Sequence, residues 1–378
     1  MNVPINKNKT AGREGEVAVA GQWKLMWWRF RKHKVAFWSG IVVLALYGIA
    51  AFCEVIAPRT PDYISADYTY APPQIIRFFR RDAGALKFGL YVNGYRMELD
   101  KVALKRRYIL DPEQVILLDF FAKGEPYRLW GIFPFDRHLV APRDSAAPFY
   151  VFGADRLGRD VFSRVMYGGR VSLSIGLIGV FLSLFLGILL GGISGYYGGI
   201  VDDAIQRVIE FLRAIPTIPL WMGLAAAIPV TWPPLRVYFA ITIILAMIGW
   251  TGMARVIRGK FFSLKNEDFV IAAKLDGCTQ MRIIMHHMVP SFMSHIIASI
   301  TLSIPGMILS ETSLSFLGIG LQPPVVSWGV LLNDAQNIRA ISSAPWLLFA
   351  PGAFVVLAVL CMNFFGDGLR DAADPYNS

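Results

Sequence analysis

Two acidic side chains stand in otherwise apolar stretches of the chain, where their chemistry would be unusual. Glu210 and Glu311 each lie in a segment long enough to cross a membrane. There an ionisable group is costly unless it faces a bundle interior or a water-lined path. The pattern predicts either a position on a translocation path or a hydrogen-bonding role between helices, and both alternatives stay open. Pro216 joins them as a candidate because proline opens or kinks a helix.

Other kinds of active site find little support in the sequence. His286 and His287 are adjacent, so a helix would point them about 100° apart, which suits a metal poorly. Residues 254–261 include Gly259-Lys260 but lack the first glycine and the Ser/Thr of a phosphate-binding loop. No nucleophile–base arrangement can be identified. We therefore expect no catalytic residue, metal or cofactor in this chain.

The composition of the chain predicts the setting of these residues. Of 378 residues, 55% are hydrophobic and 17% are charged, and the mean hydropathy is +0.47. Soluble domains carry about 25% charged residues, so a soluble globular enzyme is excluded. The three cysteines lie far apart, which rules out a disulfide framework. The composition indicates an all-α polytopic membrane protein.

Six apolar segments are long enough to cross a bilayer as helices, since a span needs roughly 20 residues. The predicted spans are residues 35–57, 171–196, 204–230, 237–256, 292–312 and 346–365. The first is longer than the apolar core of a signal peptide and follows 34 mostly polar residues. It is therefore expected to stay as a permanent helix. Glycines in the second span, spaced by three and four, predict close helix packing there.

The distribution of Lys and Arg predicts the orientation in the membrane. Residues 1–34 hold eight of these cations, and residues 255–290 hold six. Positive charge in short loops marks the cytoplasmic side. We expect both termini to be cytoplasmic and residues 58–165 to lie outside the cytoplasm. The aromatic and basic run from Trp27 to Lys34 ends where an apolar span begins, so it is interpreted as a lipid-facing anchor and not as a nucleic-acid site.

Residues 58–165 differ from the rest of the chain in their sequence pattern, which predicts a β-rich insertion. Residues 87–92 and 95–99 alternate around Asn93-Gly94, a pair that favours a two-residue hairpin turn. Further strands are predicted at 107–110, 115–121 and 127–133, separated by Asp111-Pro112 and Lys123-Gly124. The predicted domains are thus a cytoplasmic segment (1–34), a first span (35–57), this insertion (58–165) and a membrane domain (166–378).

The segment 258–290 is similar to the signature cytoplasmic loop of bacterial ABC importer permeases. It has an alanine pair, three residues, a glycine, nine residues, and then four residues ending in proline. In that family the loop forms a short helix, a turn at the glycine and a second helix, and it sits in a groove of the ATPase subunit. The resemblance assigns ATPase coupling to Ile271, Ala272, Ala273, Asp276, Gly277 and Pro290. Ile271 departs from the family's usual Glu, which removes an expected polar contact.

Further motifs make the resemblance more specific. Residues 153–164 and 168–173, 311–320 with 323–329, and 366–375 resemble dipeptide and oligopeptide permeases in the right order. The Gly-x-Asp-x-x-Gly-Arg-Asp pattern at 153–160 marks the C-type permease of that group. The resemblance implies the type I ABC importer fold with six membrane helices. The insertion departs from most members and is similar to a branch that includes the Yej-type oligopeptide permeases.

The resemblance implies a function and a set of partners. This chain would be a non-catalytic permease subunit in the bacterial inner membrane, paired with a paralogous permease. Two cytoplasmic ATPase subunits would dock below, and a periplasmic binding protein would deliver oligopeptides. Relatives that import oligosaccharides, opines or nickel leave the substrate open. A self-contained secondary transporter, and an external receptor or enzyme on membrane helices, are alternatives from other classes.

Overall fold

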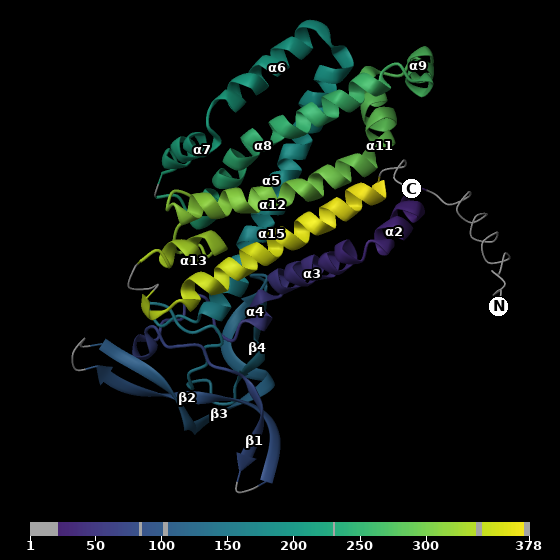
Figure 1. The fold of residues 1–378 in the computed structure, drawn as a ribbon. Coiled ribbons are helices and arrows are strands. Elements are labelled where there is room, and N and C mark those ends of the chain that lie inside the picture. Colours follow the sequence, from purple (N-terminus) through teal and green to yellow (C-terminus); the bar gives the residue numbers. More distant parts are fainter. Residues whose placement is uncertain (1–21, 83–84, 101–104, 230, 338–341, 374–378) are drawn as a thin grey trace, which may run out of the picture.

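The computed structural model describes residues 22–82, 85–100, 105–229, 231–337 and 342–373, as a helical body with a β-sheet at one end (Figure 1). Its helices are α2 (Gln22–Lys32), α3 (Lys34–Ala51), α4 (Cys53–Ile56), α5 (Val161–Tyr197), α6 (Gly199–Ala214), α7 (Thr217–Ala226), α8 (Pro234–Leu264), α9 (Asp268–Leu275), α10 (Gln280–Arg282), α11 (Val289–Ser291), α12 (Met293–Phe316), α13 (Trp328–Asp334) and α15 (Trp346–Ala373). A 3₁₀ turn covers Ala66–Tyr68 and a π-helix covers Ile283–Met288. The strands are β1 (Arg77–Asp82), β2 (Ala85–Asp100), β3 (Lys105–Leu129) and β4 (Phe133–Pro142).

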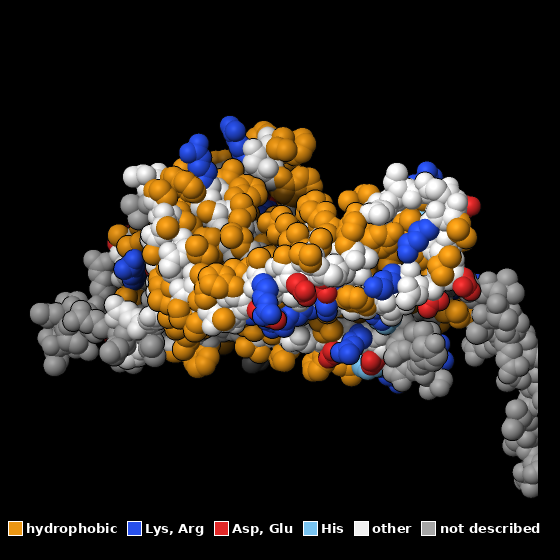
Figure 2. Space-filling view, turned by 90° about the horizontal axis from the view of Figure 1, so that it is seen from above, with side chains coloured by type: hydrophobic (Ala, Val, Ile, Leu, Met, Phe, Trp, Pro, Cys, Tyr) orange, Lys and Arg blue, Asp and Glu red, His pale blue; other side chains and the backbone are white. Residues whose placement is uncertain are grey.

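Within these described ranges, five helices are long and apolar enough to cross a membrane. They are α3, α5, α8, α12 and α15. The pair α6 and α7 would make a sixth span, but it is bent by 87° at its break. Hydrophobic side chains cover most of the face of the molecule shown in Figure 2, and charged groups gather in a few places on it. A multi-pass membrane protein follows from these helices.

The prolines act differently in the two helices that contain them. Pro216 lies at the break between α6 and α7, so the predicted third span is interrupted there. Pro305 and Gly306 do not interrupt the fifth span, because α12 runs through both without a break. Pro305 is buried in a helix that packs against α5 and α15. Neighbouring helices of this kind hold a span together after it loses one backbone hydrogen bond.

Glycines let α5 approach its neighbours closely, as their spacing predicted. A side-chain carbon at Gly191 would come within 2.5 Å of the Ala254 carbonyl oxygen on α8. One at Gly176 would meet Ile308 of α12 at 2.7 Å. Small residues permit such contact between membrane helices. Both α8 and α12 therefore pack closely against the long helix α5.

The four strands form one antiparallel sheet in the order β1-β2-β3-β4. The hairpin predicted at Asn93-Gly94 is wrong, because β2 continues straight through that pair. Asn93 pairs with Val115 and Gly94 pairs with Asp111, so the extra residues of β3 bulge outward. The breaks predicted within β3 are likewise bulges in one continuous strand. Turn-forming pairs can interrupt a ladder without ending the strand.

Several predicted segments have different boundaries in the structure. Helix α5 begins at Val161, inside the range assigned to the insertion, because the Asp160 carboxylate caps it by accepting from the backbone N–H of Ser163 at 2.8 Å. Helix α8 extends to Leu264, beyond the predicted fourth span. Residues 1–21 of the predicted N-terminal segment and Asp374-Pro375 of the tail motif lie outside the described residues.

The two ends of the helical body carry different structures. The sheet lies at one end, and α9 lies at the other, together with α2 and the end of α15 (Figure 1). Phe30 of α2 and Ala372 of α15 share a small buried cluster. We call these the sheet end and the coupling end. The N-terminal helix and the C-terminal helix thus meet at the coupling end.

Candidate functional site

The predicted coupling loop forms a short helix held against the membrane helices by an apolar cluster. Helix α9 contributes Val270 and Ala273, and both side chains are buried. They pack with Phe261 of α8 and with Ile283 and Met288 of the π-helix. The chain then enters α12 through α11. The expected order of helix, turn and second helix is therefore present, although the second helix is divided into short pieces.

Gly277 ends α9 in a geometry that favours glycine. Its φ is +74°, which side chains with a β-carbon adopt only at a cost. The backbone N–H of Gly277 donates to the Lys274 carbonyl at 3.1 Å, and the N–H of Cys278 donates to the Ala273 carbonyl at 3.1 Å. These two bonds form a Schellman motif, in which the glycine is the first residue past the helix cap. Asp276 is the exposed cap residue.

The side of α9 turned away from the membrane helices is unusually apolar. Leu275 is 83% exposed, and Phe269 and Ile271 are also exposed. Ala272 lies on this outward face. Ala273 does not, so only one member of the alanine pair is available to a partner. Sequence reasoning missed Phe269 and Leu275, although apolar residues at 269, 271 and 275 were the available signal.

Charged and aromatic contacts join α9 to other helices at the coupling end. The Lys274 ammonium lies 5.4 Å from the centre of the Tyr196 ring, at the end of α5. Nearby, Arg258 of α8 pairs with the buried Asp202 of α6. The Ser194 hydroxyl also donates to Asp202. These contacts link α9, α5, α6 and α8 at the coupling end. Pro290 is exposed and lies in α11.

The two predicted intramembrane acids lie in different surroundings. Glu311 is fully buried and accepts hydrogen bonds from the hydroxyls of Ser315 and Ser327, each at 2.8 Å. The Ser172 hydroxyl of α5 donates to it at 3.1 Å. Glu311 therefore ties α12 to α5 and to the start of α13. This geometry favours the helix-packing alternative over the translocation path.

Glu210 is exposed on α6. Its side chain is 55% exposed and pairs with Arg207 of the same helix at 3.1 Å. Pro216 follows at the break, where its carbonyl accepts the N–H of Leu220 at 3.1 Å. The structure does not bring Glu210 and Glu311 together in one site. An exposed acid in a segment of this kind can face another subunit or water.

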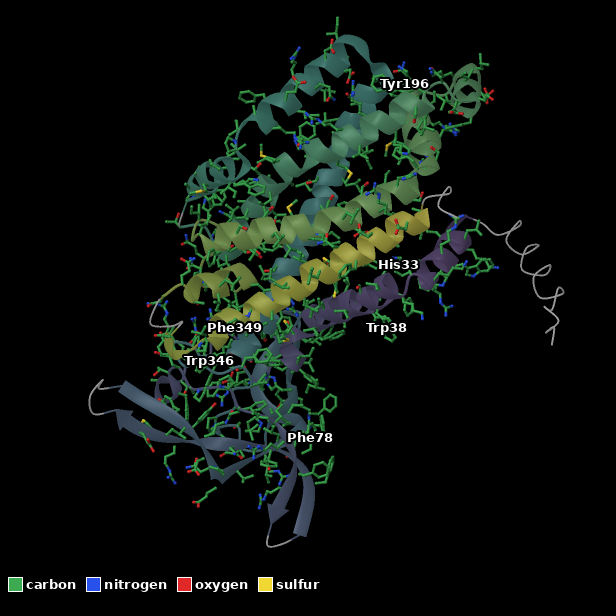
Figure 3. All side chains as sticks on the ribbon, viewed as in Figure 1. His33, Trp38, Phe78, Tyr196, Trp346 and Phe349 are labelled. Carbon is green, nitrogen blue, oxygen red and sulfur yellow. The ribbon has the colours of Figure 1, made fainter. Side chains whose placement is uncertain are left out.

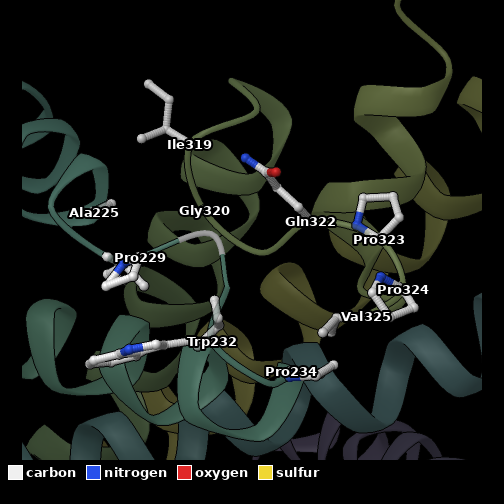
Figure 4. Close-up of a pocket in the computed structure, with 12 residues that line it drawn as sticks. Ala225, Pro229, Trp232, Pro234, Ile319, Gly320, Gln322, Pro323, Pro324 and Val325 are labelled. Carbon is white, nitrogen blue, oxygen red and sulfur yellow. The ribbon is translucent and has the colours of Figure 1, made fainter.

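A cavity of about 210 Å³ opens between two loops near the sheet end. Trp232 and Pro229 line it from the connection between α7 and α8 (Figure 4). Gln322 and Pro323 line it from the segment that follows α12 (Figure 4). Apolar walls with one amide are typical of a small-ligand pocket. No pattern in the sequence brought these two loops together.

Ionic contacts fasten the sheet end to the helices. The Arg164 guanidinium of α5 is buried and donates to Asp155 at 2.8 Å and to Asp334 of α13 at 3.2 Å. Arg159 donates to Asp155 at 2.7 Å. We call these four residues the ion network. Beside it, burial raises the pKa of Asp160 to about 6.

A second ionic contact joins α4 to α5. Glu54 is buried and pairs with Arg170. Burial pushes the pKa of Glu54 upward, but hydrogen bonds from Arg170 and from backbone N–H groups outweigh it, and the pKa is lowered. Arg170 also donates to the Ala50 carbonyl at 2.9 Å. The pair therefore closes the end of α3 against α5.

The chain belongs to the family of binding-protein-dependent transport system inner membrane components. That family matches residues 187–376. The N-terminal TM domain of oligopeptide transport permease C matches residues 21–73. The predicted resemblance to ABC peptide permeases is thereby confirmed. The chain is a membrane-spanning transport permease.

Relatives agree with this assignment. The chain is 38% identical over 279 residues to the oligopeptide transport system permease protein OppC of Haemophilus influenzae, covering 72% of this chain and 87% of that protein. It is 40% identical over 224 residues to the dipeptide transport system permease protein DppC of Bacillus subtilis, covering 59% and 68%. A solved structure of the MetNI methionine ABC transporter matches with a TM-score of 0.43 and 16% identity, covering 55% of this chain and 95% of that one. At this TM-score and identity, the structural similarity supports no functional argument.

Proposed function

We propose that this chain is one of two membrane subunits of an ATP-driven importer for oligopeptides. A paralogous permease completes the translocation path, and a binding protein delivers the peptide. Two ATPase subunits dock at the coupling end and carry out the ATP and Mg²⁺ chemistry, so this chain is not itself an enzyme. The printed names of its relatives, which are oligopeptide and dipeptide permeases, support the substrate class.

The single observation that supports ATPase docking is the apolar outward face of α9. Leu275, Phe269 and Ile271 are exposed on a helix that ends in a rigid Schellman motif. Burying a Leu or Phe side chain is worth about 1.5–3 kcal/mol. A partner that closes over this face gains that energy. The apolar cluster beneath α9 then passes the movement on to α8 and α12.

The orientation follows from the same proposal. If α9 meets cytoplasmic ATPases, the coupling end is cytoplasmic, and both chain termini lie on that side. The sheet end and the β-rich insertion then lie in the periplasm, and the helical body lies in the bacterial inner membrane. The arrangement of α2, α9 and the end of α15 at one end supports this orientation (Figure 1). Lys and Arg near that end agree with the charge rule.

The substitution Leu275→Glu tests the proposal, because it places a carboxylate in the middle of the apolar face. We expect loss of ATPase subunits on co-purification, and at least tenfold lower peptide-stimulated ATP hydrolysis and uptake in reconstituted vesicles, since about 1.4 kcal/mol is a factor of ten in binding. Met97→Glu is the matched control, because Met97 is also an exposed apolar residue but lies on β2. Normal ATPase retention and uptake in the Leu275→Glu variant would contradict the proposal.

A further inference from the structure

The turn between β3 and β4 exposes large apolar side chains in a row. It comprises Trp130, Gly131, Ile132 and Phe133, which we call the hairpin tip. Ile132 is 69% exposed, and Trp130 and Phe133 are each about half exposed. Turns usually carry Gly, Asn, Asp, Ser or Pro. Single exposed apolar residues are ordinary, but a contiguous group of them marks a surface that another apolar phase covers.

The hairpin tip is fixed to the end of the first membrane helix. The indole N–H of Trp130 donates to the carbonyl of Ala51, the last residue of α3, at 2.7 Å. Its backbone N–H donates to Glu54 at 3.2 Å. The Trp130 ring also lies 5.6 Å from the ring of Phe52, centre to centre. These contacts leave the tip little freedom to move relative to α3.

The length of α3 gives the depth of this attachment. Its 18 residues extend about 27 Å at 1.5 Å per residue, which is close to the roughly 30 Å of hydrocarbon in a bilayer. The end of α3 therefore marks the boundary between hydrocarbon and headgroups. Trp130 is bonded to that end and must lie at the same depth. Tryptophan is enriched at this boundary because its ring is apolar and its N–H is polar.

The apolar surface continues from the helix to the tip. Leu44 and Trp38 of α3 are exposed, and so is Phe52 just beyond it. Figure 3 shows Trp38 and Phe78 of β1 on the same flank of the molecule. Exposed Arg128 precedes the tip, where a cation can meet lipid phosphates. The surface that faces lipid along α3 thus runs on into the sheet.

We propose that the hairpin tip inserts into the interfacial layer of the phospholipid bilayer beside the end of α3, and so anchors the β-sheet to lipid. Ile132 and Phe133 enter the edge of the hydrocarbon, and the Trp130 indole lies among the headgroups. The sheet is held to the membrane surface at this point. The inference depends on α3 spanning the membrane and not on the cargo or on the ATPase contact.

Spin-label accessibility tests this proposal on the full chain, purified in its native assembly and reconstituted into phosphatidylcholine/phosphatidylglycerol vesicles. Nitroxides are attached at Ile132→Cys and Phe133→Cys, after Cys53, Cys278 and Cys361 are replaced by Ala. Met97→Cys is the matched control, because Met97 is exposed and pairs with Tyr108 at the opposite end of β3. We expect the labels at the tip to collide severalfold more with oxygen than with a water-soluble nickel chelate, and the control label to show the reverse.

Two outcomes overturn the proposal. Equal access of the nickel chelate to the tip and control labels would place the tip in water. Protection of the tip from both reagents would show that protein covers it. A second measurement uses the protein with its native cysteines. Phe133 is replaced by p-benzoylphenylalanine, and the reconstituted protein is irradiated. A phospholipid adduct is expected, and an adduct to a second protein chain, such as another permease, contradicts the proposal.

Discussion

The sheet end and helix α9 are attached to the helical body by different kinds of interaction. At the sheet end, Arg164 is buried between two aspartates from distant segments, and Arg170 closes on Glu54. At the coupling end, α9 packs on its neighbours through its own small and aliphatic side chains, Ala273 and Val270. Charged contacts are directional and costly to break when buried. Apolar contacts tolerate small displacements more easily, since they have no required direction.

This difference suits a molecule that receives force at one end only. In the proposed importer, the fixed sheet end would keep α5 and α13 in one arrangement while an ATPase subunit displaces α9. The apolar outward face of α9 offers binding energy without the desolvation cost that a charged face would carry. The Schellman motif at Gly277 keeps the short helix from fraying. The predictions below test whether the two ends differ in the way their contacts indicate.

The largest effect is expected from breaking the ion network. Arg164→Ala leaves Asp155 and Asp334 without their shared buried cation, which typically costs 3–5 kcal/mol. We expect a strong drop in thermal stability, or loss of folded protein from the membrane. The measurement is thermal unfolding in detergent, with yield from membranes as a second readout. Arg143→Ala is the control, because Arg143 forms an exposed pair with Asp119, and exposed pairs contribute little to stability. Equal losses in the two variants would contradict the importance of burial at the sheet end.

Acidification should act on the sheet end through Asp160. Its pKa is about 6 in the fold against 3.8 for the free group, so folding takes up a proton at intermediate pH. The resulting stabilisation reaches roughly 3 kcal/mol. It is fully present below about pH 3.8 and is lost as the pH rises through about 6. The melting temperature of the protein should therefore gain more from a shift between pH 7.5 and 5 than that of Asp160→Asn, which keeps the helix cap. The same pH response in both proteins would refute this.

At the coupling end, the alanine pair gives a matched comparison. Ala273→Leu forces a larger side chain into the buried cluster, and overpacking typically costs 1–3 kcal/mol. Ala272→Leu adds the same side chain to the exposed face and should leave stability unchanged. We expect only the first to lower the melting temperature, measured in the absence of ATPase. A lower melting temperature for Ala272→Leu would mean that this face is already covered within the chain.

Much of the helical fold could be predicted because membrane spans are recognised by their length and hydropathy. The turn at Gly277 was also predictable, since only glycine readily takes its φ of +74°. The orientation of Ala272 and Ala273 was not, because a motif gives spacing and not the face that packs inward. That face depends on Phe261 and Met288, which the chain brings near only after folding.

The sheet and the buried acid show the same limit. Asn93-Gly94 favours a turn locally, but pairing with Val115 and Asp111 keeps it extended. Long-range strand pairing overrode the local preference. The partners of Glu311 could not be found by pattern either, because Ser172 lies on α5, far away in sequence. An acid in an apolar run signals a need for partners but does not identify them.

The smallest effect is expected from Gly277→Ala. Comparing this variant with Gly277→Pro separates the strain of a positive φ from the loss of the Schellman motif. Nothing lies within 4 Å of a side-chain carbon added there, so Gly277→Ala costs only the strain of its positive φ, about 1–2 kcal/mol. Gly277→Pro also removes the N–H that donates to the Lys274 carbonyl, and its ring fixes φ at about −65°, so the Schellman turn itself cannot form. We expect the alanine variant to retain ATPase binding with reduced transport, and the proline variant to lose both while still inserting into membranes. Uptake rates and ATPase co-purification measure the two losses. If the proline variant matched the alanine variant in both, the Schellman hydrogen bonds would have no part in holding α9 in place.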